Sequence, residues 1–167
     1  LTAPLKEGHI FAMHARATPN GGPAIYLFGS SYVTFHKVNV YASPIHIAIL
    51  FYSDALKFIE CNAMPKPGTN RLTCANADGF HCRSNRKGPY IKDCHFFRIN
   101  DDDTNIFGKM FSLAKIISPT MVILNASPGG NIIGDKVSTP IYQQGELLGF
   151  VDPNQGLEID AYARVKD

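Results

Sequence analysis

The chain has 167 residues, of which 45% are hydrophobic and 18% are charged. This length suits one ordinary domain with its own core. A net charge of only +2 argues against the basic stripe through which many proteins bind nucleic acid. The longest apolar run, 45–52, is far shorter than the roughly 20 residues of a membrane helix, so no membrane span is predicted.

Alternation of apolar and polar residues predicts strands in the first half of the chain. The predicted strands are 9–16, 24–28, 33–41, 45–52 and 90–99, and residues 54–61 form either a strand or a short helix. The apolar phase changes between Phe35 and Val38, which predicts a β-bulge near residues 36–37.

In the second half, residues 106–117 carry an apolar stripe at helical spacing, and Pro119 would end that helix. The same run also fits two strands bent at Gly108. Further short strands are predicted at 121–124, 131–137, 140–143, 146–151 and 157–165. Turn signals every 8–12 residues or so are typical of sandwiches and barrels. We therefore predict one all-β domain over residues 1–167, a sandwich or barrel of about ten antiparallel strands with at most one short helix and no internal repeat.

The four cysteines, Cys61, Cys74, Cys82 and Cys94, all lie within 34 residues. Their spacings lack the close pairs of a structural zinc site, although His81 and His95 flank two of them. The clustering therefore favours a segment, 61–94, that two disulfides staple in an oxidising compartment. A hairpin turn at Asp78-Gly79 would place Cys74 opposite Cys82 and Cys61 opposite Cys94, although two other pairings remain open.

Disulfides predict a secreted protein in an extracellular or cell-wall location. The chain begins at Leu1 without an initiator Met, as expected if a leader has been removed. Asn125 begins the only N-glycosylation triplet, Asn125-Ala126-Ser127, beside a Pro-Gly-Gly turn signal.

Tests for catalytic and metal motifs all fail. Asp101, Asp103 and Asn105 match the first ligands of a calcium loop, but that loop also needs a glycine and a glutamate that are absent here. No histidine spacing matches a zinc enzyme, although His14, His36 and His46 could meet on neighbouring strands. A solvated turn and ordinary surface or satisfied histidines are therefore expected. The sequence predicts no catalytic residue, cofactor or metal.

Binding is the remaining class of function. The basic cluster Arg83, Arg86 and Lys87 and the aromatic residues Tyr142 and Tyr162 are the candidate contact residues. We predict a secreted, non-catalytic protein of the cell surface or cell wall that binds a glycan or a protein partner. The alternatives are a secreted effector that acts on another organism, and a hydrolase whose histidine and carboxylate residues converge only in the fold.

Overall fold

The structure is a computed structural model that describes residues 4, 6–9, 21–108, 111–126, 143–152, 154 and 159–166. Every regular element in this part of the chain is a β-strand, so the all-β prediction is confirmed. None of the described residues forms a helix with the length and hydrophobicity to cross a membrane. The chain separates into two compact units, Leu1–Asn125 and Ala126–Asp167, which are described separately.

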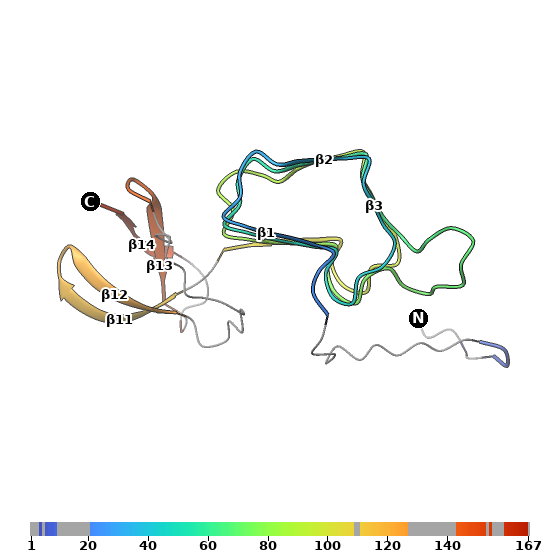
Figure 1. Ribbon diagram of the computed structural model, residues 1–167. Helices are drawn as coiled ribbons and strands as arrows, with labels where there is room; N and C mark the ends of the chain where they lie inside the picture. The colour runs from blue at the N-terminus through green and yellow to red at the C-terminus, as the bar shows by residue number, and fades with distance from the viewer. Residues whose placement is uncertain are drawn as a thin grey trace. The chain divides into compact units, whose positions relative to one another are not determined.

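The larger unit contains a parallel β-helix, in which the chain winds repeatedly through three sheets (Figure 1). The strands of the first coil, residues 25–47, are β1 (Ile25–Phe28), β2 (Thr34–His36) and β3 (Asn39–Val40). Those of the second coil, 48–79, are β4 (Ala48–Phe51), β5 (Lys57–Ile59) and β6 (Asn62–Ala63). Those of the third, 80–103, are β7 (Phe80–Arg83), β8 (Tyr90–Lys92) and β9 (His95–Phe96), and β10 (Thr104–Phe107) begins a fourth.

Each coil stacks on the previous one in parallel register. Ile25 of β1 pairs with Ala48 of β4, which pairs with Phe80 of β7. The resulting sheets are β1-β4-β7-β10, β2-β5-β8 and β3-β6-β9. The predicted antiparallel sandwich or barrel is therefore wrong for these strands, as is the predicted absence of a repeat. The second coil is longer because residues 64–73 form a loop that projects beyond the ring of strands (Figure 1).

The corners between the sheets repeat from coil to coil. Lys37, Glu60 and Asp93 follow β2, β5 and β8, and all three have a positive φ. A single residue in the left-handed region turns the chain sharply without a long loop. The phase change near residues 36–37 therefore marks a corner between two sheets, and the predicted β-bulge is wrong.

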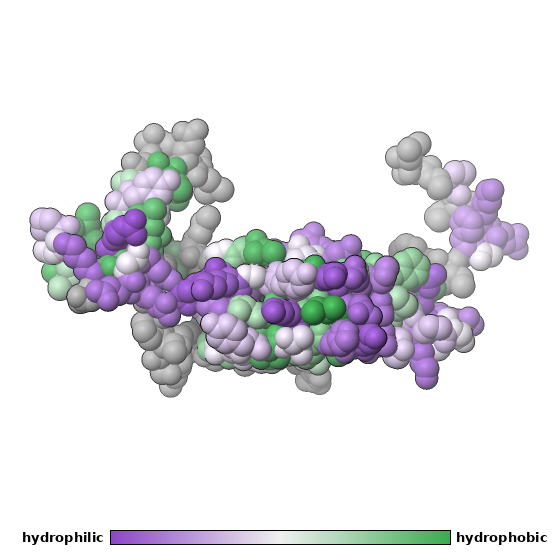
Figure 2. Space-filling view, turned by 90° about the horizontal axis from the view of Figure 1, so that it is seen from above, coloured by the Kyte–Doolittle hydropathy of each residue, from purple (hydrophilic) through white to green (hydrophobic). Residues whose placement is uncertain are grey.

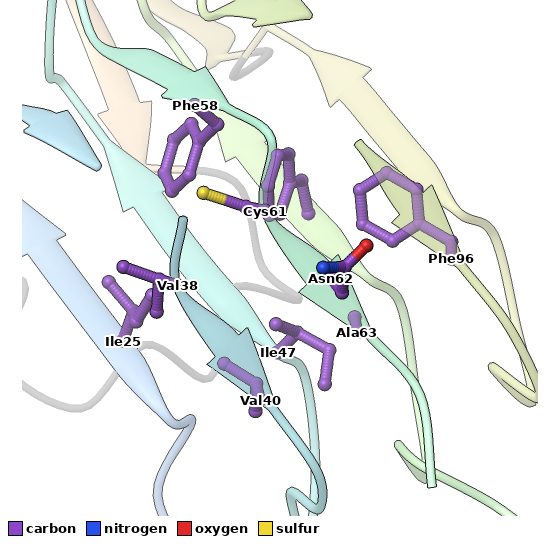
Figure 3. Close-up of a pocket in the computed structure, with 10 residues that line it drawn as sticks. Ile25, Val38, Val40, Ile47, Phe58, Cys61, Asn62, Ala63 and Phe96 are labelled. Atoms are coloured by element: carbon purple, nitrogen blue, oxygen red, sulfur yellow. The ribbon is translucent and has the colours of Figure 1, made fainter. Parts of the chain in front are cut away.

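Inward side chains form ladders that fill the interior. The largest ladder runs through Phe35, Phe58 and Ile91, which pair in register across β2, β5 and β8. The rings of Phe35 and Phe58 stack 4.8 Å apart, and Phe58 also packs on Phe80. The interior cavity holds only about 10 Å³, and its lining is almost entirely apolar (Figure 3). It is part of the core and is too small for a ligand.

Two two-stranded sheets complete the described structure. β11 (Phe111–Ser118) and β12 (Met121–Ala126) are joined by a two-residue turn, and β13 (Leu147–Val151) pairs antiparallel with β14 (Ile159–Arg164). The helix expected over 106–117 is wrong, because β10 ends at Phe107 and β11 begins at Phe111. The alternative of two strands, one on each side of Gly108, is the observed one. The strands predicted at 9–16, 131–137 and 140–143 lie almost wholly outside the described residues.

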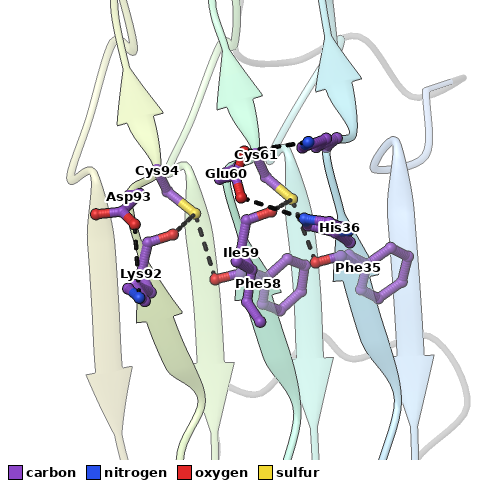
Figure 4. A network of polar contacts seen from close by, with 10 residues as sticks. Phe35, His36, Phe58, Ile59, Glu60, Cys61, Lys92, Asp93 and Cys94 are labelled. Atoms are coloured by element: carbon purple, nitrogen blue, oxygen red, sulfur yellow. Dashed lines mark hydrogen bonds and ion pairs between the residues drawn. The ribbon is translucent and has the colours of Figure 1, made fainter.

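The two predicted disulfides are absent, because all four cysteines are free thiols. Cys61 and Cys94 occupy equivalent positions one coil apart (Figure 4). Each thiol lies within hydrogen-bonding distance of two backbone carbonyls to which its one proton can be donated. These belong to Phe35 and Ile59 for Cys61, and to Phe58 and Lys92 for Cys94. The predicted hairpin is also absent, because Asp78-Gly79 leads into β7 at a corner of the β-helix. These cysteines fill the core as small apolar residues.

Thiol titration tests this arrangement. Burial raises the pKa of the Cys82 thiol to about 12 and also raises the pKa values of Cys74 and Cys94, but Cys94 is the most exposed of the four cysteines. Denatured, unreduced protein should therefore release four titratable thiols, and in the native protein Cys94 should react before Cys82, because reaction needs access and the thiolate. A titre of zero in the denatured protein would support the disulfides instead.

Candidate functional site

The outer face of the sheet β1-β4-β7-β10 carries a continuous row of aromatic side chains. Tyr26 of β1 meets Phe51 of β4 edge-on, with ring centroids 6.4 Å apart. Phe51 lies 5.7 Å from His81 of β7, and His81 lies 5.0 Å from Phe107 of β10. The row therefore crosses all four strands. Tyr26 and Phe107 are exposed, whereas Phe51 is buried.

We call the residues Tyr26, Phe28, Phe51, His81 and Phe107 the aromatic face. Phe28 extends the row, and Arg83 packs against it. Phe28, next to the row on β1, is exposed and packs against Tyr52 at 5.5 Å. The Arg83 guanidinium lies 4.2 Å from the centroid of the Phe51 ring. This cation–π contact fixes the buried ring beneath its exposed neighbours.

A cluster of His46, Asp78 and His81, the His–Asp cluster, lies beside the aromatic face. The Asp78 Oδ2 atom is 2.5 Å from His81 Nδ1 and 3.6 Å from His46 Nδ1. The two imidazoles stack with centroids 4.3 Å apart. Asp78 is almost fully buried, whereas both histidines are partly accessible. A buried carboxylate is therefore stabilised by two imidazoles that also reach the surface.

The backbone of the β-helix corner positions this cluster. His46 and Asp78 each lie two residues before a strand of the same sheet, β4 and β7, and His81 lies within β7. The backbone amide of Ile47 donates to the Asp78 carbonyl at 3.0 Å, and that of Ala48 donates to Gly79 at 2.9 Å. These bonds continue the sheet into the corner, so the separation of the two side chains is set by the stacking of the coils.

Two more carboxylates lie at the same corner in the next coil. Asp101 and Asp102 are exposed, and each offers an oxygen within 4.8 Å of the Asp78 carboxylate. The amide of Gly79 donates to the Asp102 carbonyl at 2.8 Å, which holds this segment against Asp78. The acidic run that begins at Asp101, predicted to be a solvated turn, thus adds negative charge beside the His–Asp cluster.

The outer face of β2-β5-β8 is different in character. Figure 2 views the β-helix from this side, where hydrophilic residues surround smaller apolar areas. Glu60 contacts His36 at 3.3 Å and Lys37 at 3.6 Å (Figure 4), and the hydrogen bond from His36 is the main cause of a lowered Glu60 pKa. Because these groups are exposed, we interpret them as ordinary surface ion pairs.

The predicted contact residues that the structure describes have different surroundings. Arg83 is buried against Phe51, whereas Arg86 and Lys87 are exposed and their backbone amides donate to Asp54. Tyr162 is exposed on β14 of the smaller unit. Tyr142 lies outside the described residues, and Asn125 lies in strand β12.

Of the three histidines that could meet on neighbouring strands, the two that the structure describes have different partners. His36 contacts Glu60, whereas His46 contacts Asp78 and His81, and His14 lies outside the described residues. Sequence reasoning missed the His–Asp cluster because no local motif joins its members. The one available signal was spacing, since His46 and Asp78 are separated by the same 32 positions as the paired residues Ala48 and Phe80.

Comparison with protein-family models and with curated protein sequences finds no match to this chain.

Proposed function

We propose that this protein binds an extended glycan across the aromatic face. The supporting observation is the row Tyr26–Phe51–His81–Phe107, which crosses four strands and exposes the rings of Tyr26 and Phe107 at its two ends. Exposed aromatic rings offer flat apolar surfaces on which the C–H faces of sugar rings stack, and Tyr adds a hydroxyl for hydrogen bonding.

The regular spacing of the coils suits a linear polymer. Adjacent strands lie about 4.8 Å apart, so the four strands of this sheet span about 14 Å from the first to the last. The register row Phe28, Phe51, Arg83 and Phe107 therefore recurs at a fixed interval along the axis of the β-helix. Phe28 and Phe107 are exposed on the two edge strands, so a linear chain of sugar units can contact an aromatic ring at both edges of the sheet.

Binding is tested by affinity electrophoresis and calorimetry with neutral, uronic-acid and amino-sugar polysaccharides. The variants Tyr26→Ala and Phe107→Ala should each weaken binding by about 2- to 10-fold, the value of one aromatic contact of roughly 0.5–1.5 kcal/mol. The double variant should lose about the product of the two factors, because the two residues lie on opposite edges of the sheet and are not in contact.

Tyr90→Ala is the matched control. Tyr90 lies on the β2-β5-β8 face and is 52% exposed, compared with 50% for Tyr26. Its replacement should leave the affinity unchanged. Retention of none of the polysaccharides, or an equal loss in the control, would contradict the proposal.

A hydrolase is the second candidate, and the contact between Asp78 and His81 is the observation that favours it. A histidine held by a buried carboxylate is a common arrangement for acid–base catalysis. Release of new reducing ends from a bound polysaccharide, lost in His81→Ala, would support this activity.

An extracellular or cell-wall location remains part of the proposal, and it rests on the ligand class alone since the cysteines are free.

A further inference from the structure

The His–Asp cluster has the composition and spacing of a metal site. One ligand atom from each of His46, Asp78 and His81 lies within 4.8 Å of the other two. In a tetrahedral zinc site, bonds of about 2.0–2.2 Å place neighbouring ligand atoms about 3.3 Å apart. The His46–Asp78 distance of 3.6 Å is already close to that value. When a metal ion takes the place of the hydrogen-bonding proton, the distance between His81 Nδ1 and Asp78 Oδ2 would increase from 2.5 Å by less than 1 Å.

The three residues come from three successive coils. His46 belongs to the first coil, Asp78 to the second and His81 to the third. Their backbones are fixed by the parallel register and by the corner hydrogen bonds, so little ordering is needed before an ion binds. The side chains of His46 and His81 are 19% and 21% exposed, and that of Asp78 is 5% exposed. An ion can therefore reach the cluster from one side and still be sheltered from solvent.

The ligand types select the class of ion. Two imidazoles and one carboxylate suit zinc and its neighbours, whereas calcium and magnesium prefer sites made only of oxygen. The exposed carboxylates of Asp101 and Asp102, each with an oxygen within 4.8 Å of the Asp78 carboxylate, raise the local concentration of cations.

We propose that His46, Asp78 and His81 bind one divalent transition-metal ion of the zinc class, with a fourth position open to water or a ligand. Zinc sites with three protein ligands hold a water molecule or a substrate in the fourth position. The metal site shares His81 with the aromatic face, but it does not require a glycan and is tested without one.

Calorimetric titration of tag-free, chelator-treated protein with zinc chloride is the primary test. We expect one ion per chain and an increase in melting temperature on addition of zinc. Loss of a residue that only supports a metal ligand lowers metal affinity by roughly 10- to 100-fold. Because His81→Ala and His46→Ala each remove a ligand itself, each should lower the affinity for zinc by more than that. Asp78→Asn should do the same, and it leaves a side chain of similar shape in case an alanine variant fails to fold.

His36→Ala is the matched control, because His36 also contacts a carboxylate but lies on another face. It should bind zinc as the unaltered protein does. Cobalt(II) gives a second readout, since its visible absorption reports four-coordinate binding and should disappear in His81→Ala. The absence of saturable zinc binding, or equal binding by the control and all three cluster variants, would overturn the proposal.

Discussion

Replacement of Phe58 by alanine should lower the free energy of unfolding by about 3–5 kcal/mol, the usual loss for a large aromatic residue in a packed core. Phe58 is only 1% exposed in the middle coil, where it stacks on Phe35 and packs against Phe80, 4.3 Å away. It also borders the small interior cavity, which its removal would enlarge. Because side chains of the first and third coils both pack against this ring, movement of one coil alone cannot fill the space that its removal leaves.

Urea denaturation followed by circular dichroism measures this effect. Phe97→Ala is the control, because Phe97 is 56% exposed and should change the stability much less. If the two variants were equally stable, the interior position of Phe58 would be wrong.

Gly79→Ala should destabilise the protein by about 3 kcal/mol, at the upper end of the usual range for overpacking. A Cβ atom at Gly79 would lie 2.4 Å from the backbone oxygen of Asp103 and 2.8 Å from the Phe96 ring. The first of these contacts is with the backbone, which can yield only if the third coil moves away from the second at this corner. The structural reason for glycine here is close packing, since its φ is not positive.

Gly22→Ala provides the comparison in the same denaturation experiment. No atom lies within 4 Å of a Cβ built on Gly22, and its backbone is not left-handed. Its replacement should be neutral or slightly stabilising, because alanine restricts the unfolded chain. Similar behaviour of the two variants would contradict the tight corner at Gly79.

The positions of several strands could be predicted from the sequence, but their direction could not. The alternation around Phe35 and the buried run that includes Leu50 are both in strands as predicted. Alternation reports only that one face of a strand is buried, and a parallel coil buries one face as a sandwich does. Pairing between residues 23 positions apart leaves no local trace.

The corners explain why the repeat was missed. Turn prediction depends on glycine, proline, asparagine and aspartate. Here residues such as Tyr52, Ala55 and Glu60 adopt the left-handed conformation instead. Stacking of each corner on the next supports a conformation that these residues rarely adopt alone. Conversely, Asp78-Gly79 has the composition of a hairpin turn but does not form one. The buried Asp78 side chain contacts histidines, and Gly79 is required because neighbouring atoms leave no room for a Cβ atom.

The stacking of coils also has a consequence for how the molecule opens. Each coil contacts only the coils before and after it, so the stability is approximately a sum of coil and nearest-neighbour terms. Within the part of the chain that the structure describes, only the second coil has a neighbour on both sides in all three sheets. Fraying should therefore start at the two ends of the stack, and the amides of β4, β5 and β6 should be the last to exchange with solvent deuterium.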